Sequence, residues 1–169
     1  MKNYLFIFLF LSTNIFSQDI DTLKEIALKN ATILSNASLT HDVSNILKYT
    51  HPKITKQYGE TQLKNDIETI FKTMTEQKIK IISSEINELT DIKKEKKEYH
   101  CLIKNTINID FNGKLVTLKS SLFGFYDKKI KQWYFVESNK LLNDPDTKTI
   151  FKDFTTAIII PPDEQIAND

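Results

Sequence analysis

The chain has 169 residues, of which 40% are hydrophobic and 27% charged, and its 23 basic residues nearly balance its 22 acidic ones. This composition is too apolar for a disordered chain, and the length suits one globular domain. The near-neutral charge argues against a nucleic-acid binder. All the basic residues are lysine, so no guanidinium can clamp a phosphate or carboxylate through two parallel hydrogen bonds. The single cysteine, Cys101, excludes an internal disulfide and a multi-cysteine zinc site.

The first residues have the pattern of a secretory signal peptide. Lys2 supplies a positive charge, and the apolar run over 4–11 is shorter than the roughly 20 residues that span a bilayer. We expect cleavage after Ser17, with Gln18 as the second choice, and an uncleaved anchor is the alternative. No cysteine lies near this site, so no lipid anchor is expected. The product is predicted to be periplasmic or secreted, with 22 basic and 22 acidic residues and no stable membrane anchor.

The next part of the chain is predicted to be helical. Apolar residues recur at helical spacing from Asp21 to about Asn36, with Asp19 or Asp21 as the N-cap. A second helix is expected from Thr40 to His51, because a residue that precedes proline leaves the helical region. Thr61 begins a third helix, whose apolar stripe is Leu63, Ile67, Ile70, Phe71 and Met74. Three helices are therefore expected before any strand.

Beyond Gln77 the apolar residues alternate, which is typical of strands. Ile79–Leu89 and Glu98–Phe111 are predicted as strands, joined by a charged connection over 90–97. Asn112 and Gly113 form the strongest hairpin signal in the chain, because this pair tolerates the two positive φ angles of a type I′ turn.

The hairpin fixes a register in which Phe111 pairs with Lys114. One face then carries Tyr99, Cys101 and Ile103 and is predicted to be buried, while Phe123 and Phe125 lie on the other, exposed face. A turn over 127–130 leads to an aromatic strand over 132–137. A short helix over 147–151 is expected next, after a capping turn at Asp144, and then an extended segment over 158–162 with a polar tail.

This order of elements, with the aromatic strand Trp133–Glu137 last, resembles the nuclear transport factor 2-like (SnoaL-like, cystatin-like cone) superfamily. The stretch from Tyr49 to Gly59 is similar to small exported bacterial members, and the Ser-Gln leader ending resembles those of exported Bacteroidetes proteins. The resemblance covers about residues 20–140. It implies an α+β fold, with N-terminal helices packed on a strongly curved antiparallel sheet in a cone-shaped roll.

The expected organisation is a signal peptide over 1–17, a cone domain over 18–140, and a short helix with an extended tail over 141–169. In relatives the cone encloses a pocket used for hydrophobic small molecules, for isomerase or dehydratase chemistry, or for dimerisation. No motif in this chain matches the catalytic residues of those enzymes.

The register offers one candidate site. Asn105 and Ser120 form the polar couple of the inner face, and Ser120 also pairs with Glu137 if the second hairpin has a four-residue loop. A desolvated carboxylate in that row has a raised pKa and could act as a general base. The alternative is a satisfied polar pair that marks a bend in the sheet.

Four aromatic residues complete the expected ligand-binding set: Tyr49 and Tyr58 near the cone mouth, Tyr99 on the inner face and Trp133 on the last strand. Packing at a helix end is the alternative for the first two. The histidines, His41, His51 and His100, lack metal-ligand spacing and are expected at the surface. No metal or cofactor is expected, and Cys101 is predicted to be a buried, inert thiol.

Two functions follow. The first is an exported, non-catalytic cone domain that binds a small apolar ligand or a protein partner, which could be a second copy of the chain bound through Phe123 and Phe125. The alternative is a cofactor-free isomerase, dehydratase or hydrolase that uses Glu137.

Overall fold

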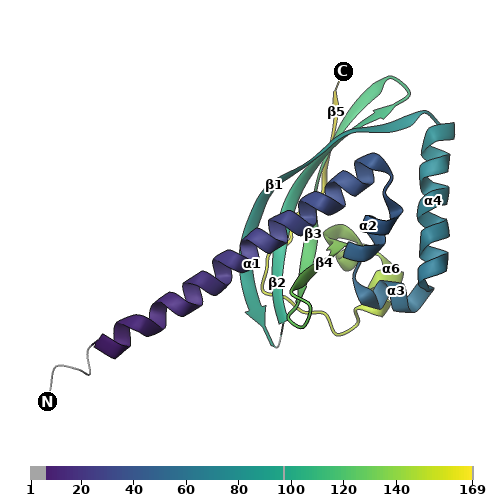
Figure 1. Cartoon of the computed structure of the whole chain (residues 1–169). Coiled ribbons are helices and arrows are strands. Elements are labelled where there is room, and N and C mark those ends of the chain that lie inside the picture. Colours follow the sequence, from purple (N-terminus) through teal and green to yellow (C-terminus); the bar gives the residue numbers. More distant parts are fainter. Residues whose placement is uncertain (1–6, 97, 169) are drawn as a thin grey trace, which may run out of the picture.

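The computed structural model of the chain describes residues 7–96 and 98–168. It has an α+β architecture, in which N-terminal helices pack against a five-stranded antiparallel sheet (Figure 1). The helices are α1 (Ile7–Thr40), α2 (Val43–Tyr49), α3 (Pro52–Tyr58), α4 (Glu60–Glu76), α5 (Ser138–Asn143) and α6 (Pro145–Ile150). The strands are β1 (Ile79–Glu95), β2 (Glu98–Phe111), β3 (Lys114–Asp127), β4 (Gln132–Glu137) and β5 (Glu164–Asn168).

The long helix α1 differs from the expected one at both ends. Asp19 and Asp21 were expected to cap it, but both lie inside a helix that begins at Ile7. Thr40 is the last residue of α1 and does not cap α2. Asp42 has that role, because its Oδ1 accepts the backbone N–H of Asn45 at 3.1 Å. Aspartate is a favoured N-cap residue, because its carboxylate, just before the helix, accepts one of the free N–H groups of the first turn.

A short helix, α3, is not among the elements predicted from the sequence. Helix α2 ends before His51 and Pro52, as predicted, but the same pair then starts α3. Proline is favoured in a first helical turn, and His51 Nδ1 caps this turn by accepting the N–H of Lys53 at 3.1 Å. Four helices therefore precede β1 in the described part of the chain, rather than three.

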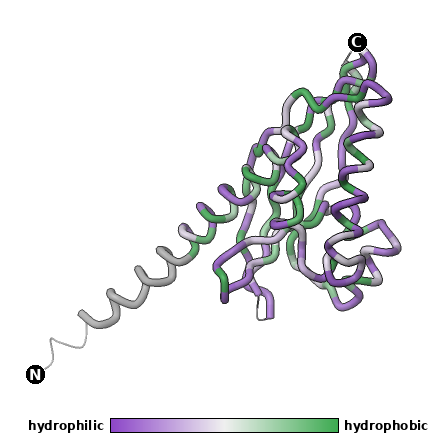
Figure 2. Tube along the Cα trace, turned by 45° about the vertical axis from the view of Figure 1, so that its right-hand side comes forward, coloured by the Kyte–Doolittle hydropathy of each residue, from purple (hydrophilic) through white to green (hydrophobic). Residues whose placement is uncertain are grey.

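Helix α4 matches its prediction within one residue, but its apolar stripe is only partly covered. Hydrophobic residues recur among hydrophilic ones along this helix in Figure 2. Ile70 is 56% exposed, and no residue of α4 is fully buried. Helix α4 stands at the rim of the fold, and the core is built by α1.

The sheet has the strand order β1-β2-β3-β4, and β5 pairs with the first half of β3, which β4 does not reach. The predicted β2–β3 register is confirmed, from Phe111 opposite Lys114 to Tyr99 opposite Tyr126. It is set by Asn112 and Gly113, whose φ angles of 55° and 92° are those a type I′ turn requires.

Strand β1 is longer than predicted and runs to Glu95, so the charged residues over 90–95 belong to the hairpin and not to a loop. Its pairing with β2 shifts register three times, between Ile81 and Ser83, Ile86 and Glu88, and Leu89 and Ile92. Such irregularities bend a strand and increase its twist.

The inner face of the sheet packs against α1. Cys101, Ile103 and Trp133 form a buried core with residues of α1, namely Leu23, Ala27 and Ala31. The alanines let the helix backbone come close to the strands. Trp133 donates its Nε1–H to the carbonyl of Leu23 at 3.0 Å, so its one polar atom is satisfied.

The outer face corrects a prediction. Phe123 and Phe125 were expected to be exposed, yet they are only 0% and 6% exposed. The segment over 151–163, which we call the strap, lies against this face and places Phe151 and Ile158 in a second buried cluster with Leu102, Phe123 and Phe125. The residues predicted to form only a polar tail then form strand β5, which pairs with β3.

Candidate functional site

A groove of about 370 Å³ opens on the outer face, between the β1–β2 hairpin and the strap. Three aromatic rings line it, those of Phe125, Phe151 and Phe154. Its ionisable and polar lining residues are Lys53, Glu95, Lys96, Glu98, His100, Asp153 and Thr155. A second hollow adjoins it and shares Glu98 and Phe125 with it.

The strand register brings the polar residues of the groove together. Glu95 pairs directly with Glu98, and His100 lies two residues further along β2. Directly opposed residues share a face of a sheet, and so do residues two apart in one strand. All three side chains therefore point to the outer face, where the strap lies.

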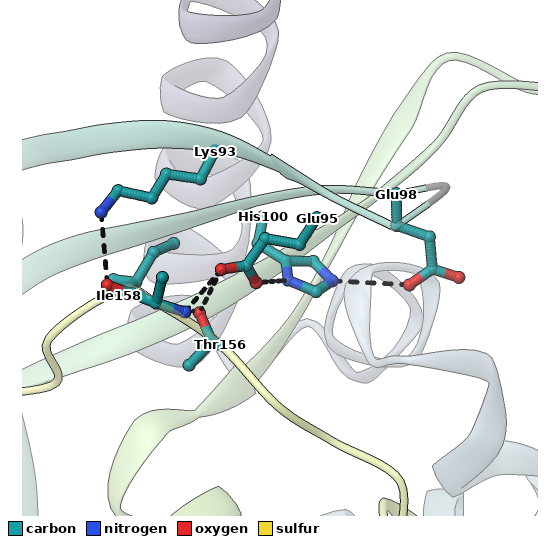
Figure 3. Close-up of polar contacts among 7 residues, drawn as sticks. Lys93, Glu95, Glu98, His100, Thr156 and Ile158 are labelled. Atoms are coloured by element: carbon teal, nitrogen blue, oxygen red, sulfur yellow. Dashed lines mark hydrogen bonds and ion pairs between the residues drawn. The ribbon is translucent and has the colours of Figure 1, made fainter.

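The central interaction of the site is a histidine–carboxylate pair (Figure 3). His100 Nδ1 lies 2.7 Å from Glu95 Oε2, and both side chains are largely buried. A carboxylate only accepts hydrogen bonds, so the network assigns a proton to Nδ1. On the other side of the ring, Nε2 is 3.5 Å from Glu98 Oε2, and the Glu98 side chain is 64% exposed.

Glu95 also fastens the strap. Its Oε1 accepts the backbone N–H of Ala157 and the hydroxyl of Thr156, and the Ala157 carbonyl accepts from Lys93 Nζ at 3.2 Å. Burial alone would raise the pKa of Glu95, but the hydrogen bonds from Ala157, His100 and Thr156 outweigh it and lower that pKa. One carboxylate thus connects the histidine to the wall of the groove.

The aromatic walls enclose a second histidine. The rings of Phe125 and Phe151 stack with centroids 5.5 Å apart, and His51 meets each of them edge-on. Burial is the main cause that lowers the pKa of His51 to about 4, and electrostatic interactions with Lys53 and His100 lower it further. His51 is therefore neutral at physiological pH; it packs against these two rings and lines the adjoining hollow rather than the groove.

The polar row predicted for the inner face is not formed. Ser120 donates to Asn105 Oδ1 at 3.0 Å, as their pairing implies. Glu137, however, pairs with Leu122 and not with Ser120. The turn covers residues 128–131 instead of the expected 127–130, so each residue of β4 pairs two positions further along β3 than predicted. The side chain of Glu137 is 60% exposed and lies 3.1 Å from Lys140 Nζ.

The four aromatic residues predicted to bind a ligand are dispersed. Tyr49 and Trp133 are buried in the inner core, and Tyr58 is exposed at the end of α3. Tyr99 contacts the ring of Tyr126 edge-on and carries Lys128 Nζ 4.7 Å from its centroid. None of these four lines the groove.

One signal for this site is present in the sequence, namely the spacing of Glu98 and His100. The Glu98-x-His100 spacing places both side chains on one face, and His100 was correctly placed on the face of Phe125. It was expected at the surface, however, and is buried by the strap. Glu95 is not among the predicted site residues, because the sequence predicts a connection rather than a strand over 90–97.

Cys101 is buried, as predicted, and burial raises the pKa of its thiol. Among the described residues, no group of three or more His, Cys, Asp or Glu side chains is arranged to hold a metal ion. No helix within 7–96 or 98–168 is long and apolar enough to cross a membrane.

Comparison of the chain with protein-family models, with curated proteins and with solved structures finds no match. Its function is therefore argued from the chemistry of the groove, since a fold by itself does not determine function.

Proposed function

We propose that the chain is an exported, non-catalytic domain that binds a small, largely apolar ligand in the outer groove. One observation carries this proposal: a groove with three phenylalanine walls that also holds the buried His100–Glu95 pair. Ligand sites are typically concave and apolar, with a few fixed polar groups, and have volumes of roughly 300–1,000 Å³. At about 370 Å³ the groove suits a ligand about the size of a substituted benzene ring.

The inner face is a poorer candidate for the ligand site. Leu23, Ala27 and Ala31 of α1 lie directly on Cys101 and Trp133, in the space where a cone cavity would be expected. The proposed site therefore moves from the inner face to the outer one.

Export is supported by the apolar run over 4–11 and by the packing of α1. Among the residues of α1 whose burial is described, from Ile20 onward, the first one buried in the core is Leu23, which lies after the expected cleavage site at Ser17. Terminal sequencing of the chain recovered from a periplasmic or culture fraction is expected to begin at Gln18. A chain that keeps its first residues and sediments with membranes would overturn this part of the proposal.

We also propose that the helices and the sheet form the strongly curved cone of the nuclear transport factor 2-like superfamily. Its support is the helices ahead of a β1-β2-β3-β4 meander and the three register shifts that bend β1. An experimental structure that superposes on members of that superfamily over 20–140 would establish it. Superposition on an unrelated open sheet would refute it.

The positions of Glu137, Phe123 and Phe125 do not support the two other predicted roles, catalysis by Glu137 and dimerisation through the two phenylalanines. The carboxylate of Glu137 is solvated beside Lys140, and the two phenylalanines are covered. A binding role for the groove does not depend on either of them.

The binding proposal is tested with para-ethylanisole, a neutral aromatic probe, followed by amide chemical shifts in NMR spectra. Saturable shifts are expected in the strap over 151–157 and at Glu98 and His100. A Thr155→Trp variant, which fills the groove from an exposed position, is expected to weaken binding at least tenfold. Thr73→Trp, on the exposed side of α4, is the matched control and is expected to bind normally.

Absence of saturable shifts, or shifts confined to the inner face, would overturn the binding proposal. Mass spectrometry of protein purified under native conditions gives an independent test, because a bound apolar compound is expected to be lost in the Thr155→Trp variant and retained in Thr73→Trp.

A further inference from the structure

The polar groups deep in the groove accept hydrogen bonds. With its proton on Nδ1, the His100 ring presents Nε2 as an acceptor. Glu98 Oε2 lies near this nitrogen but cannot donate to it when ionised, and the 3.5 Å separation is at the limit for a hydrogen bond. The exposed Glu98 side chain can move aside. A ligand that complements this point must bring a hydrogen-bond donor.

The rim of the groove disfavours a ligand with a full charge. An anion would meet Glu95, Glu98 and Asp153, while a cation would meet Lys53 and Lys96. Lys53 Nζ already lies over the ring of Phe151, 5.2 Å from its centroid. A neutral donor group avoids the desolvation penalty that a charged group would pay there.

The walls define the rest of the ligand. Phe125 and Phe151 are stacked, and the ring of Phe154 is inclined by 61° to that of Phe125, so the groove presents both ring faces and ring edges. A flat aromatic ring matches these surfaces through offset-stacked and edge-to-face contacts.

We infer that the groove selects neutral aromatic alcohols of the phenol class, whose O–H donates to Nε2 of His100 while the ring packs against Phe125, Phe151 and Phe154. The inference rests on the proposed function and specifies its ligand. Glu95 acts as a positioning residue, because its hydrogen bond keeps the proton on Nδ1 and leaves Nε2 free to accept.

The test compares para-ethylphenol with para-ethylanisole, which differs by one methyl group that removes the donor. The dissociation constant of the phenol is expected to be about tenfold lower, since one net hydrogen bond contributes roughly that factor. In the His100→Phe variant, which keeps an aromatic ring but loses the acceptor, the two probes are expected to bind equally.

Nitrogen chemical shifts of the His100 ring give a readout that does not depend on a variant. The free protein is expected to show a protonated Nδ1 and an unprotonated Nε2, and the phenol is expected to shift the Nε2 resonance far more than the anisole does. In Glu95→Gln the side-chain amide can donate to Nδ1, so the proton is expected to move to Nε2 and the preference for the phenol to fall.

The failures of the two proposals are distinguishable. Equal affinity of the wild-type protein for phenol and anisole, or tighter binding of para-ethylbenzylamine or para-ethylbenzoate, overturns the ligand class and leaves the groove as a binding site. Failure of every probe to bind overturns the proposed function itself. If His100→Phe does not fold, the wild-type ring shifts decide the question.

Discussion

The two faces of the sheet are both buried, but they are covered in different ways. The inner face lies under α1, a helix that satisfies its own backbone groups. Its apolar core is joined to the sheet by neutral hydrogen bonds, from Ser35 to Ser84 and from the Trp133 N–H to Asn30. The outer face lies under the strap, which is irregular over most of its length and whose backbone must find partners elsewhere. Glu95 and Lys93 supply these partners for Ala157. Ionisable side chains of the sheet, those of Glu95 and Lys93, therefore hold the cover that is not a helix, whereas α1 is held by apolar packing and neutral hydrogen bonds.

The largest effect is expected on the inner face, from loss of Trp133. This fully buried residue fills the space under α1, so Trp133→Ala is expected to lower the free energy of unfolding by roughly 3–5 kcal/mol. Urea denaturation followed by circular dichroism measures this loss. Ile70→Ala on α4 is the control and is expected to cost far less, because its side chain is mostly exposed. Similar losses for the two variants would mean that the inner face is not the dominant core.

The second effect concerns the outer face and pH. The folded pKa of His51, about 4, lies below its ordinary value of 6.5, so the unfolded chain binds more protons between these values. Stability contributed by neutral His51 is complete above pH 6.5 and is lost as pH falls towards 4, by up to about 3 kcal/mol.

The variant that isolates this effect is His51→Asn, which retains a side chain able to cap α3. Its unfolding free energy, measured at pH 7, 5.5 and 4, is expected to fall less steeply than that of the wild-type protein. Parallel pH profiles for the two proteins would contradict the buried, neutral histidine.

A third effect tests the tight inner packing between β2 and β3. A Cβ added at Gly124 would lie 2.5 Å from Cys101 Sγ, so Gly124→Ala is expected to destabilise the protein by roughly 1–3 kcal/mol. Adding Cys101→Ala removes that sulfur and is expected to recover part of the loss. A double-mutant cycle in urea measures the coupling. Simple additivity would show that the two sites do not clash.

The smallest effect is expected at the strap. Glu95→Gln weakens the hydrogen bonds to Ala157 and His100, so hydrogen exchange at the Ala157 amide is expected to accelerate several-fold. The control is Glu88→Gln, which lies on β1 like Glu95 but alters only an exposed ion pair with Lys104 of β2. Because the pKa of Glu95 is lowered on folding, its contribution is present above the ordinary value of 4.5 and is lost as pH falls through the lowered one. Equal exchange in both variants would show that Glu95 does not fasten the strap.

The sequence predicted what depends on local chemistry. The Asn112-Gly113 turn and the alternation of apolar residues were enough for the β2–β3 register, and Pro52 was enough for the end of α2. The predicted Asp144 cap is confirmed as well, since this side chain accepts the N–H of Thr147.

The features that were missed depend on contacts between distant segments. Nothing local shows that residues 151–163 return to cover Phe123 and Phe125, or that Glu164–Asn168 pairs with β3. The position of Glu137 depended on the register of the second hairpin, which has no Asn-Gly pair to fix it. The groove combines Glu95, His100 and the strap, and so became visible only in three dimensions.

The comparison of the two faces is tested most directly by intermolecular nuclear Overhauser effects between bound para-ethylanisole and the protein. Because the groove lies on the outer face, the ring protons of the probe are expected to contact Phe125, Phe151 and Phe154. Contacts to Trp133 or Tyr49 on the inner face would contradict this expectation.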